Sequence, residues 1–265
     1  MRRFDWVAEF RRIWVAKPVI LVEGEDDIPF YKHLLRLVDP DWEDRFGIEW
    51  VGGKSYVFQA CKKVPLWRGM VDCDEWDTAK IASEQQKVPN VHILPRFMAQ
   101  SYWINPDELW NLLPEHQRLS HPQAQAQLNT DIETQRADWV AHGAMWRVML
   151  RRRTGLGGLG FPRELMKLPV TDENRIMDIL NRWHDYLNPA DIITEYQQER
   201  DSVLSLGLDK QYAKVIHGKM FFTRVVARAL NKAFGQQKAR VWTDEIIQGM
   251  TVPADLEPVL RTLLS

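Results

Sequence analysis

The hydrophobic positions in the first half of the chain alternate between short continuous runs and helical spacing. A continuous apolar run is typical of a strand buried on both faces of a sheet. Runs that we interpret as strands lie at residues 18–22, 47–51, 69–72 and 90–94. Helical spacing follows at residues 28–38, 57–64 and 77–87, and another helix is expected to start at Asn105–Glu108. Short links between such elements predict a parallel sheet with right-handed crossovers.

The second half of the chain has helical spacing almost throughout. The segment Gln123–Gln127 is polar and is interpreted as a loop or the start of a helix. Helices are predicted at residues 138–153, 172–187, 190–206, 219–234 and 253–264. The pattern therefore predicts an α/β domain over residues 1–115, with a four-stranded parallel, Rossmann-like sheet and flanking helices. A mainly helical domain is predicted over residues 116–265.

The composition is that of an ordinary globular protein, with 45% hydrophobic and 27% charged residues. The sequence has no run of 18 apolar residues, so we expect no membrane partner. Residues 1–15 lack the continuous apolar core of a signal peptide. Two cysteines provide neither a disulfide framework nor a zinc site. We therefore expect a cytoplasmic protein.

Charge is distributed unevenly along the chain. Residues 1–115 carry 15 Lys and Arg against 19 Asp and Glu, whereas residues 116–265 carry 20 against 17. An acidic half suits a bound cation and a basic half suits phosphates, although such an imbalance also arises on surfaces without function. The 12 tryptophans would suit cores and a dimer interface.

Acidic residues follow two of the predicted strands. Glu23 comes directly after the first strand, and Asp72 and Asp74 end the third. Neighbouring strands in a sheet lie about 5 Å apart, so these carboxylates are expected to converge at one edge. Mg²⁺ prefers such oxygen ligands and can activate water beside a phosphate. The alternative interpretation is that each acid only caps the helix that follows it.

This arrangement resembles the Toprim pattern, in which strand–Glu-Gly-x-x-Asp is followed by a Gly-Lys turn and strand–Asp-x-Asp. Topoisomerases, bacterial primases, small RNA-maturation nucleases and OLD-family nucleases share the pattern. The resemblance covers residues 17–113. The stretches at residues 19–31, 92–96 and 102–110 look closest to OLD-like, single-domain Toprim effectors of bacterial anti-phage defence. Several of these effectors, as in PARIS-type systems, are encoded beside an ABC-type ATPase.

The resemblance implies roles for individual residues. Glu23 would be a metal ligand or general base, and Asp72 and Asp74 would be metal ligands, with Mg²⁺ or Mn²⁺ as the cofactor. Asp27 matches the Asp of the first motif and would bind a second metal or support the ligands. Lys54, in the Gly-Lys turn, would contact phosphate, or would be a solvated turn lysine.

One position departs from the family pattern. Relatives often carry a glutamate after the fourth strand, where this chain has Gln100. A glutamine lacks the negative charge, which leaves the number of metals open at one or two. Asp107 or Glu108 would be alternative ligands.

Basic residues of the second half are candidates for holding nucleic acid. Arg151, Arg152 and Arg153 precede a stretch, Gly155–Gly160, that satisfies Gly-x-Gly-x-x-Gly. The stretch follows a basic helix rather than a strand, so we reject dinucleotide binding. Two interpretations of this segment remain. It is either a mobile basic loop near the substrate, or the capped end of a helix with Arg at its negative pole.

A second basic segment lies nearer the C-terminus. Arg224, Arg228 and Lys232 are spaced four apart, as on a helix face that follows a phosphate backbone or is simply solvated. Lys219 follows Gly218, and a Gly-Lys before the last long helix recurs in the Toprim relatives. By that resemblance, Lys219 would stabilise charge at the scissile phosphate.

The leading hypothesis is a metal-dependent endonuclease that cleaves DNA or RNA, with tRNA among the candidate substrates. It would be a toxic defence effector controlled by an ATPase partner and dimeric when active. The alternative is a catalytically inactive Toprim module that binds nucleic acid or signals. A primase or topoisomerase fragment ranks lower, because the second half shows no motif of either.

Overall fold

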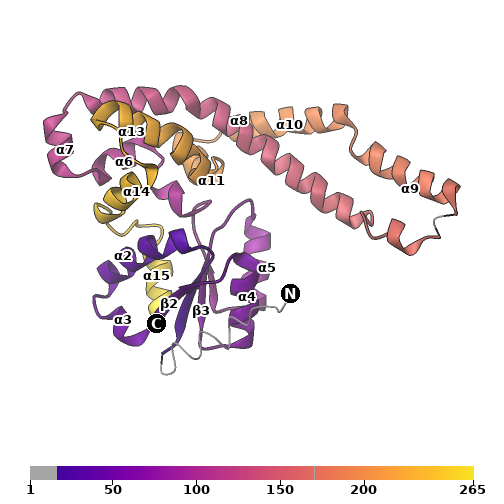
Figure 1. The fold of residues 1–265 in the computed structure, drawn as a ribbon, viewed down its shortest axis with the longest axis horizontal. Helices are drawn as coiled ribbons and strands as arrows, with labels where there is room; N and C mark the ends of the chain where they lie inside the picture. The colour runs from indigo at the N-terminus through magenta and orange to yellow at the C-terminus, as the bar shows by residue number, and fades with distance from the viewer. Residues whose placement is uncertain (1–16, 170) are drawn as a thin grey trace. The chain divides into compact units, whose positions relative to one another are not determined.

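A computed structural model describes residues 17–169 and 171–265 of the chain (Figure 1). Four parallel strands form one sheet in the order β2-β1-β3-β4. The strands are β1 (Val19–Val22), β2 (Gly47–Trp50), β3 (Arg68–Val71) and β4 (Val91–Ile93). The predicted α/β class and all four predicted strands are confirmed.

Strand β1 is the centre of the sheet. All four of its residues are buried, and it pairs with β2 on one edge and with β3 on the other. Val22 pairs with Trp50 and Leu21 with Gly69, so all three strands run to the same edge. A continuous apolar run is needed here because side chains on both faces of β1 are covered.

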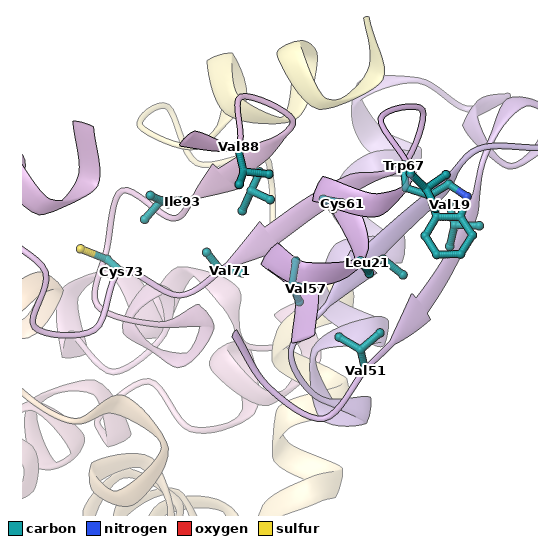
Figure 2. Packing of buried hydrophobic residues seen from close by; sticks show 13 residues of the cluster. Val19, Leu21, Val51, Val57, Cys61, Trp67, Val71, Cys73, Val88 and Ile93 are labelled. Atoms are coloured by element: carbon teal, nitrogen blue, oxygen red, sulfur yellow. The ribbon is translucent and has the colours of Figure 1, made fainter. Parts of the chain in front are cut away.

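Helices cover the two faces of the sheet (Figure 1). Helices α2 (Ile28–Val38), α3 (Trp42–Arg45) and α15 (Glu257–Leu264) lie on one face, and α4 (Lys54–Lys63) and α5 (Thr78–Lys87) lie on the other. The core beneath α4 and α5 is built from alternate residues of the strands and from one side of α4 (Figure 2). Its buried members include Leu21, Val57, Cys61, Val71 and Val91.

The chain forms two compact units. One unit combines the described chain up to Gln135 with Tyr212–Ser265, and the other is Arg136–Gln211. This division differs from the predicted boundary near residue 115, because the C-terminal segment returns to the sheet. His33 Nε2 lies 2.8 Å from the carbonyl oxygen of Met250, and α15 packs beside α2.

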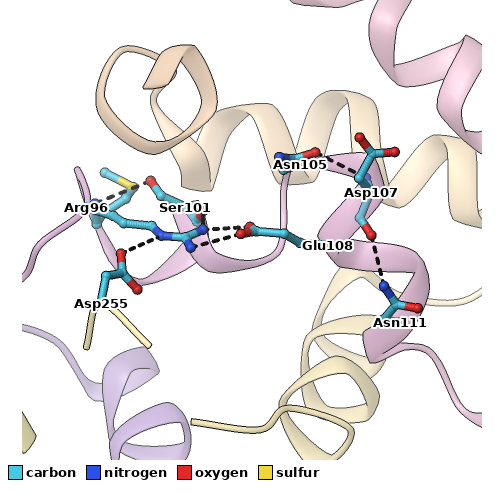
Figure 3. A network of polar contacts seen from close by, with 8 residues as sticks. Arg96, Ser101, Asn105, Asp107, Glu108, Asn111 and Asp255 are labelled. Atoms are coloured by element: carbon cyan, nitrogen blue, oxygen red, sulfur yellow. Dashed lines mark hydrogen bonds and ion pairs between the residues drawn. The ribbon is translucent and has the colours of Figure 1, made fainter. Parts of the chain in front are cut away.

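Arg96 joins three segments of the first unit (Figure 3). Its guanidinium donates to both carboxylate oxygens of Glu108, at 2.6 and 2.9 Å, and to Asp255 at 3.1 Å. It also donates to the carbonyl of Ser101 and lies over the ring of Tyr102. A largely buried, bidentate arginine of this kind fixes geometry more firmly than an exposed ion pair.

The second unit is built around the long helix α8 (Ala124–Gly158), which begins in the first unit, together with α9 (Glu173–Tyr186) and α10 (Pro189–Leu204). Ion pairs join α10 to α8 in an antiparallel sense, from Arg147 with Glu199 to Arg152 with Glu195. Trp183 of α9 donates to the carbonyl of Leu159 at 3.1 Å.

The glycine-rich stretch is not a loop over most of its length. Helix α8 continues through Gly158, past the predicted end at Arg153. Tyr186 lies so close to Gly155 that an added Cβ would stand 1.9 Å from the phenol oxygen. The glycine therefore allows close packing between helices. The polar stretch at Gln123–Gln127 is a helix start, since α8 begins at Ala124.

The predicted helix at residues 219–234 is divided. It consists of α12 (Gly218–Phe221), a π-helical turn η4 (Phe222–Val226) and α13 (Ala227–Phe234). The other helical segments are η1 (Glu25–Asp27), η2 (Ala99–Tyr102), α6 (Pro106–Leu112), α7 (Glu115–Ser120), η3 (Leu165–Lys167), α11 (Leu208–Lys214) and α14 (Ala239–Gln248). Within the described residues, no helix has the length and apolar character required to cross a bilayer.

Gly69 provides a test of the packing between β3 and α4. A Cβ added there would lie 2.5 Å from Cγ1 of Val57 and 3.0 Å from Cγ2 of Val91. We expect Gly69→Ala to reduce the free energy of unfolding by about 1–3 kcal/mol, as overpacked cores do. Urea unfolding followed by circular dichroism measures the loss.

Val57→Ala gives the matched control, because it removes the atom that the new methyl group would strike. Gly69→Ala should cost less in the Val57→Ala background than in the wild type. Simple additivity of the two losses would show that this contact does not limit the packing.

Candidate functional site

Glu23 and Asp72 meet at the carboxyl edge of the sheet. Glu23 directly follows β1 and Asp72 directly follows β3, and the two strands are hydrogen-bonded neighbours. The backbone N–H of Asp72 donates to Oε1 of Glu23 at 2.8 Å. This bond between residues 49 positions apart fixes the glutamate against the neighbouring strand.

Asp27 is held at the same edge by its own turn. Its Oδ2 accepts a hydrogen bond from the backbone N–H of Gly24 at 2.9 Å. The residue ends η1 and precedes α2, so its place depends on the turn that follows β1.

Burial and mutual repulsion govern the electrostatics of these acids. Burial raises the pKa of Glu23, and the ammonium of Lys54 and the N–H of Asp72 partly offset that rise. Burial also raises the pKa of Asp27, against the hydrogen bond from Gly24. The pKa of Asp72 is raised well above its usual range by burial first, then by the charges of Asp27, Glu23 and Asp74. The site therefore favours a cation or a proton.

Asp74 is already paired with a lysine. Its Oδ2 accepts from Lys54 Nζ at 2.6 Å, and the lysine side chain is only 14% exposed. The same ammonium lies 4.3 Å from the ring centroid of Trp76. Lys54 is therefore part of the acidic centre, the name used below for the group Glu23, Asp27, Asp72 and Asp74, and is not a solvated turn lysine.

Backbone geometry places this pair. Gly52 and Gly53 have φ values of +84° and +136°, a region that glycine adopts readily, and α4 begins at Lys54. Asp74 has a φ of +49°, which is uncommon for a residue other than glycine. Both turns follow strands that end at the same edge.

The donor chemistry of the four acids suits a hard divalent cation. Carboxylate oxygens are the ligands that Mg²⁺ and Mn²⁺ prefer, and a cation would relieve the repulsion among these partly buried acids. The side chains do not form a ready-made shell. Among residues 17–169 and 171–265, no three His, Cys, Asp or Glu side chains are grouped closely enough to hold a metal. Asp74 in particular is bound to Lys54.

Lys219 pairs with an acid in the turn that follows β1. Its Nζ is 2.9 Å from Oδ2 of Asp26, and this pairing lowers the pKa of Asp26. Gly218, at the start of α12, allows α12 to pack closely on η2, because an added Cβ would lie 3.1 Å from the backbone nitrogen of Ser101. The fold therefore brings Lys219 to the edge of the sheet that carries the acids. No local pattern in the sequence predicted Asp26 as its partner.

The alternative ligands suggested by the resemblance to the Toprim pattern, Asp107 and Glu108, make contacts elsewhere. Glu108 is bound bidentately to Arg96 (Figure 3). Asp107 accepts from Asn129 at 3.5 Å and contributes to the start of α6. Gln100 packs against Gly218 through its Cβ and backbone.

The basic candidates fall into two groups. In the second unit, Arg151 pairs with Glu195 and Glu199, and Arg152 pairs with Glu195, whereas Arg153 is exposed. The charges of Arg151 and Arg152 are offset within the unit and hold α10 on α8. In the first unit, Arg224 and Arg228 are exposed, whereas Lys232 pairs with Asp131.

In comparisons with known proteins, no family model, no curated protein and no solved structure matched this chain.

The raised pKa of Asp72 leads to a prediction about pH. The folded protein keeps a proton on Asp72 over a pH range in which the unfolded chain has lost it, so unfolding becomes easier as pH rises through that range. In EDTA at pH 7.5, we expect Asp72→Asn to be more stable than the wild type by about 0.5–2 kcal/mol. The gain should shrink near pH 4, as measured by urea unfolding at each pH.

Asp26→Asn is the matched control, because its shift has the opposite sign. The pKa of Asp26 is lowered by Lys219, so its contribution is present at neutral pH and is lost as pH falls. This variant should show no gain at pH 7.5. A wild type that is more stable than Asp72→Asn at both pH values would contradict the electrostatic account of the cluster.

Proposed function

We propose that the protein is a Toprim-type, metal-dependent endonuclease that hydrolyses phosphodiester bonds of DNA or RNA. One observation carries the proposal: Glu23, Asp27, Asp72 and Asp74 follow strands β1 and β3 at the carboxyl edge of a parallel sheet, and their charges interact. In open α/β sheets, that edge is where ligands bind. Buried carboxylates with raised pKa values are also a feature of functional sites.

Each acid has a distinct role in the proposal. Asp72 and Asp74 hold the cation, with Glu23 as a further ligand or as the general base. The N–H of Asp72 orients the Glu23 carboxylate, and burial keeps the pKa of that carboxyl raised, which suits proton transfer. Asp27, in the turn after β1, adds to the negative charge that attracts the cation. Mg²⁺ or Mn²⁺, when bound, would supply an activated water and neutralise phosphate charge.

Basic side chains of the same unit would hold the substrate. Lys219 at the acidic edge would stabilise charge on the scissile phosphate. Arg224 and Arg228, both exposed, would contact the phosphate backbone. Arg151 and Arg152 are omitted from the proposed contacts, because their glutamate partners already offset their charge.

The biological setting follows from the Toprim resemblance. We propose a toxic effector of anti-phage defence that is restrained by an ABC-type ATPase and is dimeric when active. Control by a partner would be needed because an unrestrained nuclease damages its own cell.

The test uses Glu23→Gln, which preserves side-chain size and removes the charge. With Mg²⁺ or Mn²⁺, the wild type should cleave plasmid DNA, total RNA or tRNA. The variant should be at least about 10²-fold slower, the usual effect of losing a general base. Glu25→Gln, an exposed neighbour in the same turn, should retain wild-type rates. Equal rates for wild type and Glu23→Gln would refute the assignment.

Expression in cells gives a second measurement of the same proposal. Sequencing the nucleic acid cut on expression of wild type, but not of Glu23→Gln, would identify the substrate. Cleavage by neither protein in any setting would leave no support for a nuclease.

A catalytically inactive binding module is the second candidate. Two observations favour it: Gln100 stands where proteins with the Toprim pattern often have a glutamate, and the described residues form no grouped metal site. Calorimetric titration with Mn²⁺ separates the candidates. The inactive module predicts the same weak heats for wild type and for the double variant Asp72→Ala/Asp74→Ala.

A further inference from the structure

Lys54 and Asp74 form a close ion pair at the edge of the sheet that carries the acids. The two side chains come from different strand ends, 20 residues apart, and their charged atoms are 2.6 Å apart. Exposed surface pairs contribute little to stability and are easily exchanged with water. This lysine is mostly buried, so its position is a feature of the folded site.

An aromatic ring fixes the ammonium from a second side. Trp76 lies two residues after Asp74, and its ring centroid is 4.3 Å from Lys54 Nζ. Phe58 of α4 packs against that ring at 5.9 Å between centroids. The ammonium is therefore held between a carboxylate and an aromatic face, both of which attract a cation.

The charge of Lys54 acts on other acids of the centre as well as on Asp74. Besides binding Asp74, its charge lowers the free energy of the ionised forms of Glu23 and Asp72. It thereby offsets negative charge at β1 and at β3, whereas Lys219 acts on Asp26 and Asp27. As long as it holds Asp74, however, that carboxylate is not free to join a metal shell with its neighbours.

We propose that Lys54 is a resident counter-cation, which holds Asp74 while the centre lacks a divalent metal, yields Asp74 when the metal binds, and then contacts the substrate phosphate. This inference rests on the proposed metal-dependent function. A divalent ion carries more charge than an ammonium and binds several carboxylates at once, so it would displace the lysine. No bond other than these ionic contacts is made or broken in the exchange.

Metal affinity is the direct test. Mn²⁺ would be titrated calorimetrically into metal-free wild type, Lys54→Met and Lys80→Met. Loss of the competing ammonium should tighten binding by Lys54→Met about three- to tenfold, as expected for one charge at close range. Lys80 is the matched control, because its ammonium lies 5.4 Å from the same Trp76 ring but pairs with Glu84. Lys80→Met should bind Mn²⁺ as the wild type does.

Two further experiments test whether the site tolerates substitution and whether the ion pair breaks when the metal binds. Lys54→Arg keeps both the charge and the pair, so it should fold and bind Mn²⁺ like the wild type, which shows that the site survives substitution. A double-mutant cycle of Lys54→Met and Asp74→Asn should show coupling in melting temperature in EDTA. The coupling should disappear with saturating Mn²⁺, because the pair is then already broken.

The outcomes separate the inference from the function on which it rests. If the wild type binds Mn²⁺ and Lys54→Met binds no more tightly than Lys80→Met, the counter-cation role is refuted and the metal-dependent function stands. Coupling that persists in Mn²⁺ would likewise refute the exchange. If neither the wild type nor Lys54→Met binds Mn²⁺, the metal-dependent function fails and the inference fails with it.

Discussion

Strand β1 is paired on both edges and covered on both faces, and the rest of the first unit is arranged around that constraint. A buried backbone must have its N–H and C=O groups paired, and β1 achieves this through β2 on one side and β3 on the other. Parallel neighbours require crossover connections, so helices must pass over the sheet. Every strand then ends at the same edge, and the turns at that edge carry Glu23, Gly52 and Asp72.

Convergence at that edge creates an electrostatic problem that the fold only partly relieves. Burial is the largest cause of the raised pKa values of Glu23 and Asp72, and the charges of neighbouring acids raise both pKa values further. Backbone N–H groups of Asp72 and Gly24 offset part of this cost, and Lys54 supplies a full positive charge. The proposed function requires that a divalent metal take over this counter-charge from Lys54.

The return of the C-terminal segment completes the first unit. Arg96 binds Asp255 as well as Glu108, and Lys219 reaches Asp26. The second unit, Arg136–Gln211, is therefore an insertion in sequence between two parts of one compact body. Its helices are joined by their own ion pairs, such as Arg151 with Glu195.

The sequence by itself determined the strands, the limits of α2, α5, α9 and α10 to within about two residues, and the acids at the strand ends, because these depend on local patterns. A continuous apolar run such as 19–22 has few alternatives, and Asp77 and Asn105 cap the helices that they precede. Only the tertiary structure decided which charges meet. Lys219 and Asp26 are 193 residues apart, Glu108 is bound to Arg96, and Lys54 is held by Asp74 and Trp76. The close packing of Tyr186 on Gly155 is another contact between residues distant in sequence. Contacts of this kind are set by three-dimensional packing and have no counterpart in local spacing.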